Sequence, residues 1–279
     1  MAAAGVTGTT CTVRTPGRVT NNHAAKASGC SREPRGRGTR QLCDWRVRTR
    51  TVACMPTTEV QSGATLVAAR GLLFDLDGVI LDSTMDAVLR WRAFSARHGF
   101  DEREILTVAH GQRTVDTIAA YMPAALVASE TQWFETLDVS DGEINALPGA
   151  KELLASLPRD SWCIVTSCPR NLAIERLERL GIRVPAVLVG AEDVPVGKPS
   201  PVPYLAGLDA LGVTAPDALV FEDAPSGISS GVAAGARVVA LLTTHERSVL
   251  AGTYYVTDLS SVSVVDSTSH ALVLAIARV

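Results

Sequence analysis

Two aspartates, one residue apart, end a short apolar run and are the first residues in the chain whose spacing suggests chemistry. The stretch from Gly71 to Ser83 reads GLLFDLDGVILDS, so that Asp75 and Asp77 follow an apolar segment of three residues. Such a segment is too short for a helix and is typical of a buried parallel strand, and open α/β sheets bind ligands at the carboxyl ends of their strands. Two carboxylates there repel each other unless a cation lies between them or one is protonated. The pair therefore predicts a reactive site, against the alternative of an ordinary Asp-Gly turn.

Further polar residues follow later predicted strands. Thr166 and Ser167 end the strand that begins at Trp162, whereas Glu222 and Asp223 follow the strand over residues 218–221. Lys198 lies in a loop between them, in the sequence VGKPSP. Because parallel strands end at the same edge of a sheet, we expect these groups to meet the two aspartates there. Considered singly, each has an alternative explanation: capping of a strand end, a solvated lysine, or a solvated acidic turn.

The order of the predicted elements divides the chain into three parts. Residues 1–69 are a basic N-terminal extension, predicted to be disordered over residues 1–54, followed by a short lead-in over residues 56–69. Helical periodicity at about 84–99, 101–109, 113–121 and 124–138 predicts an all-helical insert over residues 84–145. Strands and helices alternate elsewhere, so residues 70–83 and 146–279 are predicted to form an α/β core whose parallel sheet is covered on both faces. Two late apolar runs, Tyr254–Val256 and Ala271–Val279, are predicted to be edge strands.

Charge is unevenly distributed along the 279 residues, whose net charge is −3. Residues 1–54 hold ten Lys and Arg against two acidic residues, so the remainder of the chain carries −11 and gives no reason to expect nucleic-acid binding. The basic segment has three interpretations. It is a targeting segment, an arm for RNA or an acidic partner, or a stretch absent from the working protein, for which Met55 is an alternative start.

Cysteine spacing and hydropathy predict the cellular setting. Four of the six cysteines lie within residues 1–54 without the CxxC spacing of a zinc site. Cys163 and Cys168 fall in a predicted strand and the loop after it, where reduced thiols are expected. Since no apolar run approaches the length of a membrane span, the sequence predicts a cytoplasmic protein with no membrane partner.

The motifs resemble those of one known family. FDLDGVILDS resembles the first motif of the haloacid dehalogenase (HAD) superfamily, TSCPRN its second, VGKPSP its third and VFEDAPSG its fourth, in that order along the chain. The resemblance implies a Rossmann-like three-layer core with a parallel sheet and an inserted all-helical cap. It also implies a phosphatase that depends on Mg²⁺, because the dehalogenases themselves lack the second aspartate of the first motif.

The resemblance also implies roles for the core residues. Asp75 is expected to be the nucleophile that forms an aspartyl-phosphate, and Asp77 the general acid and base. Lys198 is expected to neutralise charge on the transferred phosphoryl group, which Thr166 or Ser167 would also bind. Hard oxygen ligands for Mg²⁺ would come from the residues around this edge. The expected ligands are Asp75, the backbone carbonyl of Asp77, Asp223 and, through water, Glu222.

The insert resembles the helical cap of the first HAD subfamily, and one stretch in it points to a substrate class. AHGQRT, residues 109–114, is similar to a segment of sugar- and polyol-phosphate phosphatases, including glycerol-phosphate and 2-deoxyglucose-6-phosphate phosphatases. Gly111 would permit close approach of the backbone to a ligand, and Arg113 would clamp oxygens of the non-reacting part of the substrate. His110 would bind a hydroxyl group, or alternatively cap a helix. The expected substrate is a small sugar or polyol phosphate.

Two other functions compete with phosphate hydrolysis. A phosphosugar mutase related to β-phosphoglucomutase would retain its intermediate, but such mutases carry a histidine in the first cap helix where this chain has Ala87. A non-catalytic protein that binds partners through its Arg-rich N-terminal arm would need none of the four motifs. The intact motifs therefore favour hydrolysis of a small-molecule phosphate ester.

Overall fold

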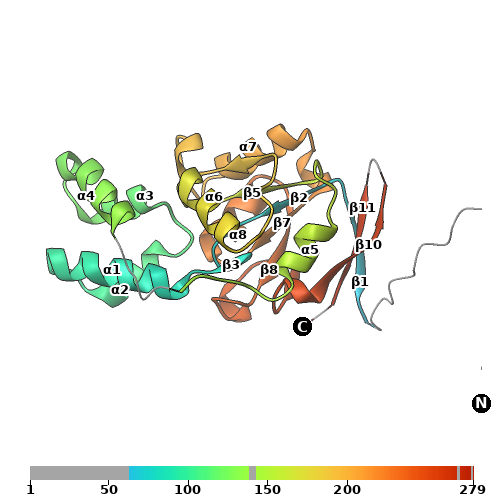
Figure 1. The fold of residues 1–279 in the computed structure, drawn as a ribbon, viewed down its shortest axis with the longest axis horizontal. Coiled ribbons are helices and arrows are strands. Elements are labelled where there is room, and N and C mark those ends of the chain that lie inside the picture. The colour runs from blue at the N-terminus through green and yellow to red at the C-terminus, as the bar shows by residue number, and fades with distance from the viewer. Residues whose placement is uncertain (1–62, 138–142, 269–270, 278) are drawn as a thin grey trace, which may run out of the picture. The chain divides into compact units, whose positions relative to one another are not determined.

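A six-stranded parallel sheet lies at the centre of the computed structural model, which describes residues 63–137, 143–268, 271–277 and 279 (Figure 1). Its strands, in spatial order, are β6 (Leu188–Val189), β5 (Trp162–Val165), β2 (Gly71–Phe74), β7 (Ala218–Glu222), β8 (Arg237–Leu241) and β9 (Tyr254–Val256). Strand β2 pairs with β5 and β7 in parallel, in a register that places Phe74 beside Ile164 and Phe221. The strand bearing the first motif is therefore central, with the other motif strands on either side.

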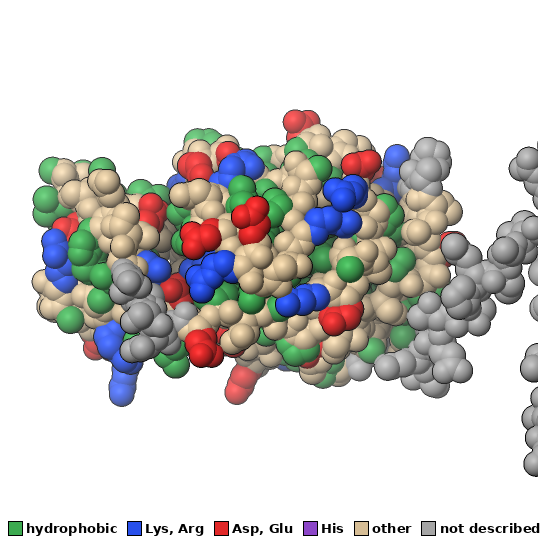
Figure 2. Space-filling model, in the orientation of Figure 1, with side chains coloured by type: hydrophobic (Ala, Val, Ile, Leu, Met, Phe, Trp, Pro, Cys, Tyr) green, Lys and Arg blue, Asp and Glu red, His purple; other side chains and the backbone are tan. Residues whose placement is uncertain are grey.

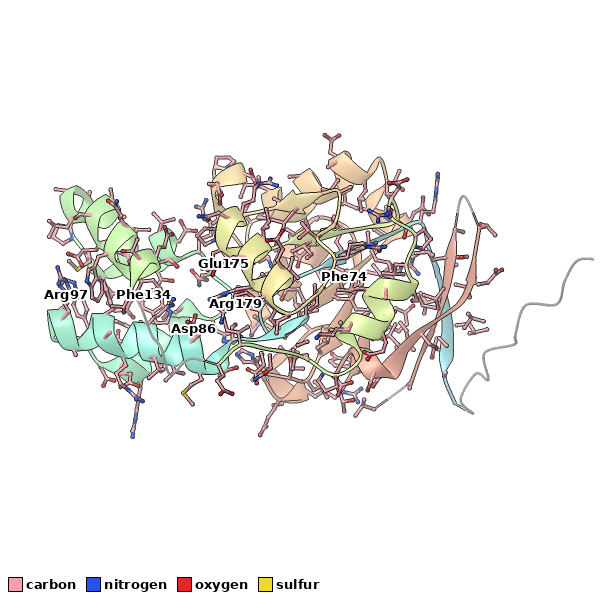
Figure 3. The ribbon with its side chains drawn as sticks, in the orientation of Figure 1. Phe74, Asp86, Arg97, Phe134, Glu175 and Arg179 are labelled. Carbon is pink, nitrogen blue, oxygen red and sulfur yellow. The ribbon has the colours of Figure 1, made fainter. Side chains whose placement is uncertain are left out.

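Helices cover both faces of this sheet, because successive residues of the buried strands point to opposite sides. The covering helices are α5 (Ala150–Ser156), α6 (Arg170–Arg179), α7 (Val202–Leu211) and α8 (Pro225–Ala233). Leu72 and Phe74 share one apolar cluster with Leu177 of α6, whereas Leu73 shares another with Tyr204 of α7. The predicted three-layer α/β fold is confirmed. Phe74 lies within the core, one residue before the first catalytic candidate (Figure 3).

A second, antiparallel sheet corrects part of the sequence prediction. Strand β11 (Leu272–Ile276) pairs on one side with β1 (Thr65–Ala69) and on the other with β10 (Val262–Ser267). The prediction of an edge strand over residues 271–279 is therefore wrong, since β11 is the middle strand. Strand β1 lies in the stretch interpreted as a lead-in. It alternates between exposed Leu66 and buried Val67, the pattern of a strand with only one covered face.

The described part of the insert contains four helices and lies between the two-residue strands β3 (Leu81–Asp82) and β4 (Asn145–Ala146), which pair antiparallel. They are α1 (Thr84–His98), α2 (Glu102–Ala109), α3 (Thr114–Tyr121) and α4 (Ala124–Thr136), all in the ranges predicted to be helical. The insert has its own apolar cluster, in which the Trp91 ring lies 4.3 Å from that of Phe134 and 5.6 Å from that of Phe94. This separate cluster lets the helices pack without using the core of the sheet.

The surface shows no single-sign patch on the face in Figure 2, where acidic and basic side chains are interspersed. Among the described residues, no helix has both the length and the apolar character required to cross a membrane. The predictions made for the basic N-terminal segment, with its four cysteines, fall outside the described residues.

Candidate active site

The carboxyl edge of the central sheet brings together the acidic residues that the sequence predicted to meet. Asp75 follows β2, and its backbone N–H donates to the carbonyl of Phe221 in β7 (3.0 Å). Asp223 follows β7 and is 1% exposed, while Asp75 is 6% exposed. Potential metal-binding oxygen atoms of Asp75, Glu222 and Asp223 lie within 4.8 Å of one another. Three carboxylates from two neighbouring strands therefore share one buried site.

Lys198 supplies the positive charge of this cluster. Its ammonium Nζ donates to Asp75 Oδ1 (2.5 Å), to Glu222 Oε1 (2.6 Å) and to the carbonyl oxygen of Val165 (3.1 Å). Burial lowers the pKa of Lys198, but the charges of Asp75 and Glu222 outweigh burial and raise it above its ordinary value. Lys198 therefore stays protonated, and its three partners fix the ammonium beside the predicted nucleophile.

Glu222 is held so completely that its geometry favours a positioning role over direct metal binding. Its Oε1 accepts hydrogen bonds from Lys198 and from the Tyr204 hydroxyl (2.7 Å). Its Oε2 accepts from the backbone N–H groups of Asp223 (3.1 Å) and Ala224 (3.3 Å). Both oxygens are thus engaged by protein donors, which leaves Asp75 and Asp223 as the carboxylates with free capacity.

Asp223 carries the observation that best fits a cation. Its Oδ1 atom is buried and has no hydrogen-bond partner among the described residues, whereas Oδ2 accepts from His110 (3.1 Å) and from Thr244. An unpartnered buried carboxylate oxygen is costly unless a cation or a proton satisfies it. Burial also raises the pKa of Asp75 well above its ordinary value, since Glu222 and Asp223 add to the rise and Lys198 only partly opposes it. The cluster therefore fits a divalent cation with oxygen ligands.

Asp77 lies beside this cluster, in the loop that begins the insert, and is held by two donors. Ser83 Oγ (2.5 Å) and Arg176 Nη1 (2.9 Å) both donate to Asp77 Oδ1. Among the described residues no hydrogen bond reaches Oδ2, which is therefore free for proton transfer. Arg176 also donates to Asp86 of α1 (2.7 Å), and Asp86 in turn accepts from Arg90 (3.1 Å).

Sequence reasoning missed this network of Ser83, Asp86, Arg90 and Arg176. Arg176 on α6 is 7% exposed and Asp86 on α1 is 5% exposed. The two buried charges form an ion pair and neutralise each other. In the sequence both residues lie among ordinary helical charges, and only their burial distinguishes them. Figure 3 labels Asp86 at the end of α1 that lies nearest the core.

The hydroxyl groups of Thr166 and Ser167 have different surroundings, although both residues line the cavity at the active site. Thr166 Oγ1 accepts from the backbone N–H of Cys168 (3.0 Å). Ser167 Oγ donates to the carbonyl oxygen of Gly111 in the insert (3.0 Å). Ser167 therefore links the second motif to the insert, and Thr166 shapes the loop after β5.

The three insert residues singled out in the sequence are divided between two locations. His110 and Gly111 line the cavity, and His110 Nε2 lies 3.1 Å from Asp223 Oδ2. Burial lowers the pKa of His110, but its hydrogen bond to Asp223 and the charge of that residue outweigh burial and raise it. Arg113 is not among the residues that line the cavity. It pairs with Asp116 (2.6 Å) and donates to the carbonyl oxygen of Val194 (2.9 Å), so its contacts favour fastening the insert to the core over binding substrate.

Gly111 lies where a side chain would disturb the contact between insert and core, and we expect Gly111→Ala to lower kcat/KM by about 10–100-fold. Its φ is +74°, and an added Cβ would lie 2.6 Å from Ser226 Oγ and 2.7 Å from Ala224 Cβ. Gly99→Ala is a matched control in the same insert, with φ +75° and nothing within 4 Å of an added Cβ. Steady-state kinetics of both variants check the prediction. Equal losses would show that backbone strain, and not crowding against the core, is responsible.

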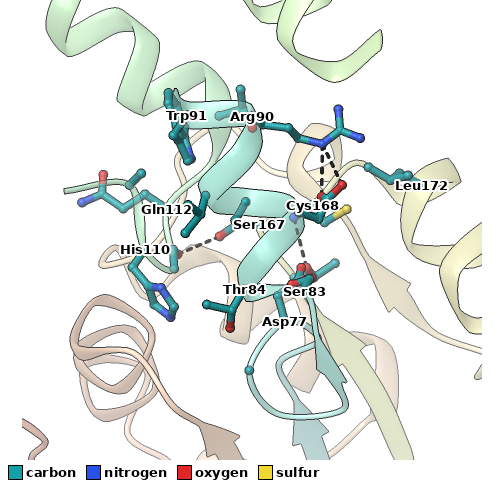
Figure 4. A pocket seen from close by; sticks show the side chains of 18 of the residues that line it. Asp77, Ser83, Thr84, Arg90, Trp91, His110, Gln112, Ser167, Cys168 and Leu172 are labelled. Carbon is teal, nitrogen blue, oxygen red and sulfur yellow. Dashed lines mark hydrogen bonds and ion pairs between the residues drawn. The ribbon is translucent and has the colours of Figure 1, made fainter. Parts of the chain in front are cut away.

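The cavity between the insert and the core has a volume of about 180 Å³. Figure 4 shows His110 and Gln112 from the insert, Ser167 and Cys168 from the core, and Asp77 beside the first helix around this space. Asp75 and Asp77 thus line a cavity whose wall is formed by the core and the insert together. That arrangement fits a reaction at one group of a small molecule whose other groups contact the insert.

Comparison with known proteins agrees with this geometry. The model of the haloacid dehalogenase-like hydrolase family matches residues 72–241. Hexitol phosphatase A of Escherichia coli is 38% identical over 178 residues, covering 62% of this chain and 82% of the relative. For 2-deoxyglucose-6-phosphate phosphatase 2 of Saccharomyces cerevisiae, identity is 34% over 229 residues, covering 72% of this chain and 93% of the relative.

Further similarities extend to a third phosphatase and to a solved structure. Glycerol-1-phosphate phosphohydrolase 2 of Saccharomyces cerevisiae is 37% identical over 191 residues, covering 64% of this chain and 76% of the relative. The crystal structure of a hydrolase from Pseudomonas syringae has a TM-score of 0.60 and 25% identity, covering 68% of this chain and 94% of that one. The family predicted from the four motifs is confirmed: the chain belongs to the haloacid dehalogenase-like hydrolase family.

Proposed function

We propose that the protein hydrolyses the monophosphate ester of a small sugar or polyol. The observation that carries the proposal is the buried contact of Lys198 with Asp75 (2.5 Å), beside the unpartnered Oδ1 of Asp223. This is the charge arrangement that transfer of a phosphoryl group to a carboxylate requires. The substrate class is supported by the relatives, whose names specify hexitol, glycerol 1-phosphate and 2-deoxyglucose 6-phosphate.

The reaction proceeds in two displacements at phosphorus. A carboxylate oxygen of Asp75 forms a bond to phosphorus while the bond to the ester oxygen breaks, and Asp77 gives its proton to the departing alcohol. Asp77 then takes a proton from water, whose oxygen forms a bond to phosphorus while the bond from phosphorus to Asp75 breaks, so that inorganic phosphate leaves and the Asp75 carboxylate is restored. Ser83 and Arg176 hold Asp77 through one oxygen, so the other remains available for both proton transfers.

Asp75, Asp223 and the backbone carbonyl of Asp77 are the groups that would hold Mg²⁺. Hard oxygen ligands suit this ion, and Asp223 Oδ1 has the capacity for it. When bound, the cation supplies positive charge that offsets the phosphoryl oxygens and the clustered carboxylates. Lys198 contributes to the same balance through its contact with Asp75, and Glu222 fixes the position of Lys198.

The insert, residues 84–145, acts as a cap that selects the substrate. Thr84, Gln112 and Thr114 line the cavity with polar side chains that make no hydrogen bond to another described residue. Unpaired hydroxyl and amide groups in a cavity are suited to binding the hydroxyl groups of a sugar or polyol. The apolar side of the cavity includes Trp91, which is mostly engaged in the packing of the insert.

Phosphate release from a panel of small esters tests the proposal. We expect turnover of hexitol phosphates, glycerol 1-phosphate or 2-deoxyglucose 6-phosphate with Mg²⁺, and at least a 100-fold loss after EDTA treatment, roughly the contribution of several kcal/mol that a catalytic cation makes. Restored activity on adding Mg²⁺ is the control for damage by the chelator. Turnover that survives complete removal of divalent metal would contradict the assignment of the carboxylate cluster.

The same assay discriminates against the mutase. A mutase would convert a hexose 1-phosphate without accumulating free phosphate, so product analysis alongside phosphate release separates the two reactions. Ala87 lines the cavity at the position where the mutases carry a histidine. Hydrolysis is therefore the expected outcome.

A further inference from the structure

His110 contacts the oxygen of Asp223 that the Mg²⁺ assignment does not use, and a second histidine, His245, lies close by. His110 comes from the insert and is adjacent to α2, while His245 comes from the loop after β8. Their rings meet edge to face with centroids 4.9 Å apart. Three possible ligand atoms lie within 4.8 Å of one another, one each from His110, Asp223 and His245. The motifs of the sequence drew attention to His110 alone, and no step proposed above uses His245.

We propose that His110, Asp223 and His245 form a second metal site that binds Zn²⁺ or a similar first-row transition ion and inhibits the enzyme. Two imidazole nitrogens and one carboxylate oxygen are ligands that transition ions prefer, whereas Mg²⁺ prefers oxygen alone. The two sites share Asp223 but differ in the type of their other ligands, because the cluster around Asp75 and Lys198 contains no nitrogen ligand available to a cation.

The observed spacing needs little change to admit an ion. His110 Nε2 and Asp223 Oδ2 lie 3.1 Å apart. Two atoms bound to one Zn²⁺ at about 2.0–2.1 Å each are separated by about this distance. His245 completes the set, and its Nδ1 lies 3.0 Å from Thr244 Oγ1, the hydroxyl that also donates to Asp223 Oδ2.

The two oxygens of Asp223 allow both sites to be filled at once. Oδ2 faces His110 and Thr244, whereas Oδ1 has no protein partner among the described residues. A bridging carboxylate can therefore serve Mg²⁺ with one oxygen and the transition ion with the other. The His110 side chain is 36% exposed, which gives an ion from solvent access to the site.

The positions of the three metal ligands in the insert and the core explain why the bound ion would inhibit the enzyme. His110 belongs to the insert, while Asp223 and His245 belong to the core. One ion bound to these three residues would therefore connect the insert to the core. Release of product from a closed cavity requires the insert to move. An ion that fastens the insert to the core would slow that movement and lower kcat.

The test uses the Mg²⁺-saturated protein and compares His245→Ala with wild type. In wild type we expect Zn²⁺ to inhibit phosphate release from the best substrate, and we expect the half-inhibiting concentration to rise at least about tenfold in the variant, since even loss of an outer-shell partner weakens metal binding by about 10–100-fold. Turnover without Zn²⁺ should be preserved. An equal half-inhibiting concentration in both proteins would show that Zn²⁺ acts by displacing Mg²⁺, and would overturn the proposal.

Binding is measured separately with Co²⁺, whose visible absorption reports nitrogen and oxygen ligands. Mg²⁺-saturated wild type should bind one equivalent with an absorption band that His245→Ala lacks. Two control variants complete the design. Cys168→Ser should keep the Co²⁺ band and the inhibition by Zn²⁺, and loss of either would assign the metal to the thiol in the same cavity. His98 pairs with Glu130 in the insert, away from the proposed site, and His98→Gln should also retain the Co²⁺ band and the inhibition by Zn²⁺.

Failure of this inference is distinguishable from failure of the proposed function. The Co²⁺ measurement requires no substrate, so it is valid even if none of the esters is hydrolysed. Conversely, the activity panel with Mg²⁺ is unaffected by whether the second site exists. Absence of a Co²⁺ band in wild type at saturating Mg²⁺ would overturn the second site alone.

Discussion

Asp75→Asn is expected to lower phosphate release by about 10³-fold or more while the protein remains folded. The amide of asparagine has the size of the carboxylate but cannot form the acyl-phosphate bond. Lys198 keeps two of its three partners, Glu222 and the carbonyl oxygen of Val165, so the loop that carries it stays in place. Because burial already disfavours the charged form of Asp75, we expect the unfolding free energy of the metal-free variant to be at least that of wild type.

Turnover and urea unfolding measured on the same preparation check this expectation. Asp209→Asn, an exposed aspartate on α7, is the matched control and should leave both quantities unchanged. Rapid acid quench of wild type with labelled substrate should trap phosphate on the protein, and hydroxylamine should remove it. Activity in Asp75→Asn within about tenfold of wild type would exclude Asp75 as the nucleophile.

Lys198→Met is expected to cause the second-largest loss, in both stability and activity. Removing one member of a buried ion pair costs about 3–5 kcal/mol, because the partners remain buried without compensation. Here Asp75 and Glu222 would both lose their cation, and the Val165 carbonyl would lose a donor. Loss of the charge beside the phosphoryl group should lower kcat by a further factor of about 10²–10³.

A double variant separates the two effects of Lys198. The variant Lys198→Met/Glu222→Gln removes the Glu222 carboxylate together with the ammonium group of Lys198. Much of the stability lost in Lys198→Met should therefore return, whereas the activity should not. Lys151→Met, on the exposed face of α5, controls for loss of a lysine. Urea unfolding without metal gives the stability, and phosphate release with Mg²⁺ gives the activity. If the unfolding free energy of Lys198→Met lay within about 1 kcal/mol of that of wild type, the importance of the buried ion pair would be contradicted.

The core of the site was predictable from sequence because strand ends are a strong local signal. Apolar runs that stop abruptly at Asp75, Thr166 and Glu222 define three strands, and a parallel sheet places all three ends on one edge. Lys198 was instead found from its place in the loop VGKPSP, between the second and fourth motifs. The structure changes the interpretation of Glu222 alone among these, since its oxygens are engaged by Lys198, Tyr204 and two backbone N–H groups.

What sequence could not predict depends on contacts between distant segments. Arg176 and Asp86 are separated by ninety positions and meet only because α6 and α1 approach the same loop. His245 follows a strand with no motif around it, and only the fold brings it to Asp223. The second sheet was partly missed for a related reason. Strand β1 buries one face and pairs with β11 from the other end of the chain, so no local turn marks the pairing.

The attachment of the insert has a consequence for how such enzymes diversify. The short ladder of β3 and β4, with Leu81 beside Ala146 and Asp82 beside Asn145, pairs the two ends of the insert with each other, and the apolar cluster of the insert is separate from those of the sheet. Mutations that remodel the wall facing the leaving group can therefore accumulate without weakening the scaffold that holds Asp75 and Lys198. In a family with this architecture, substrate preference can change during evolution while the catalysed reaction stays the same.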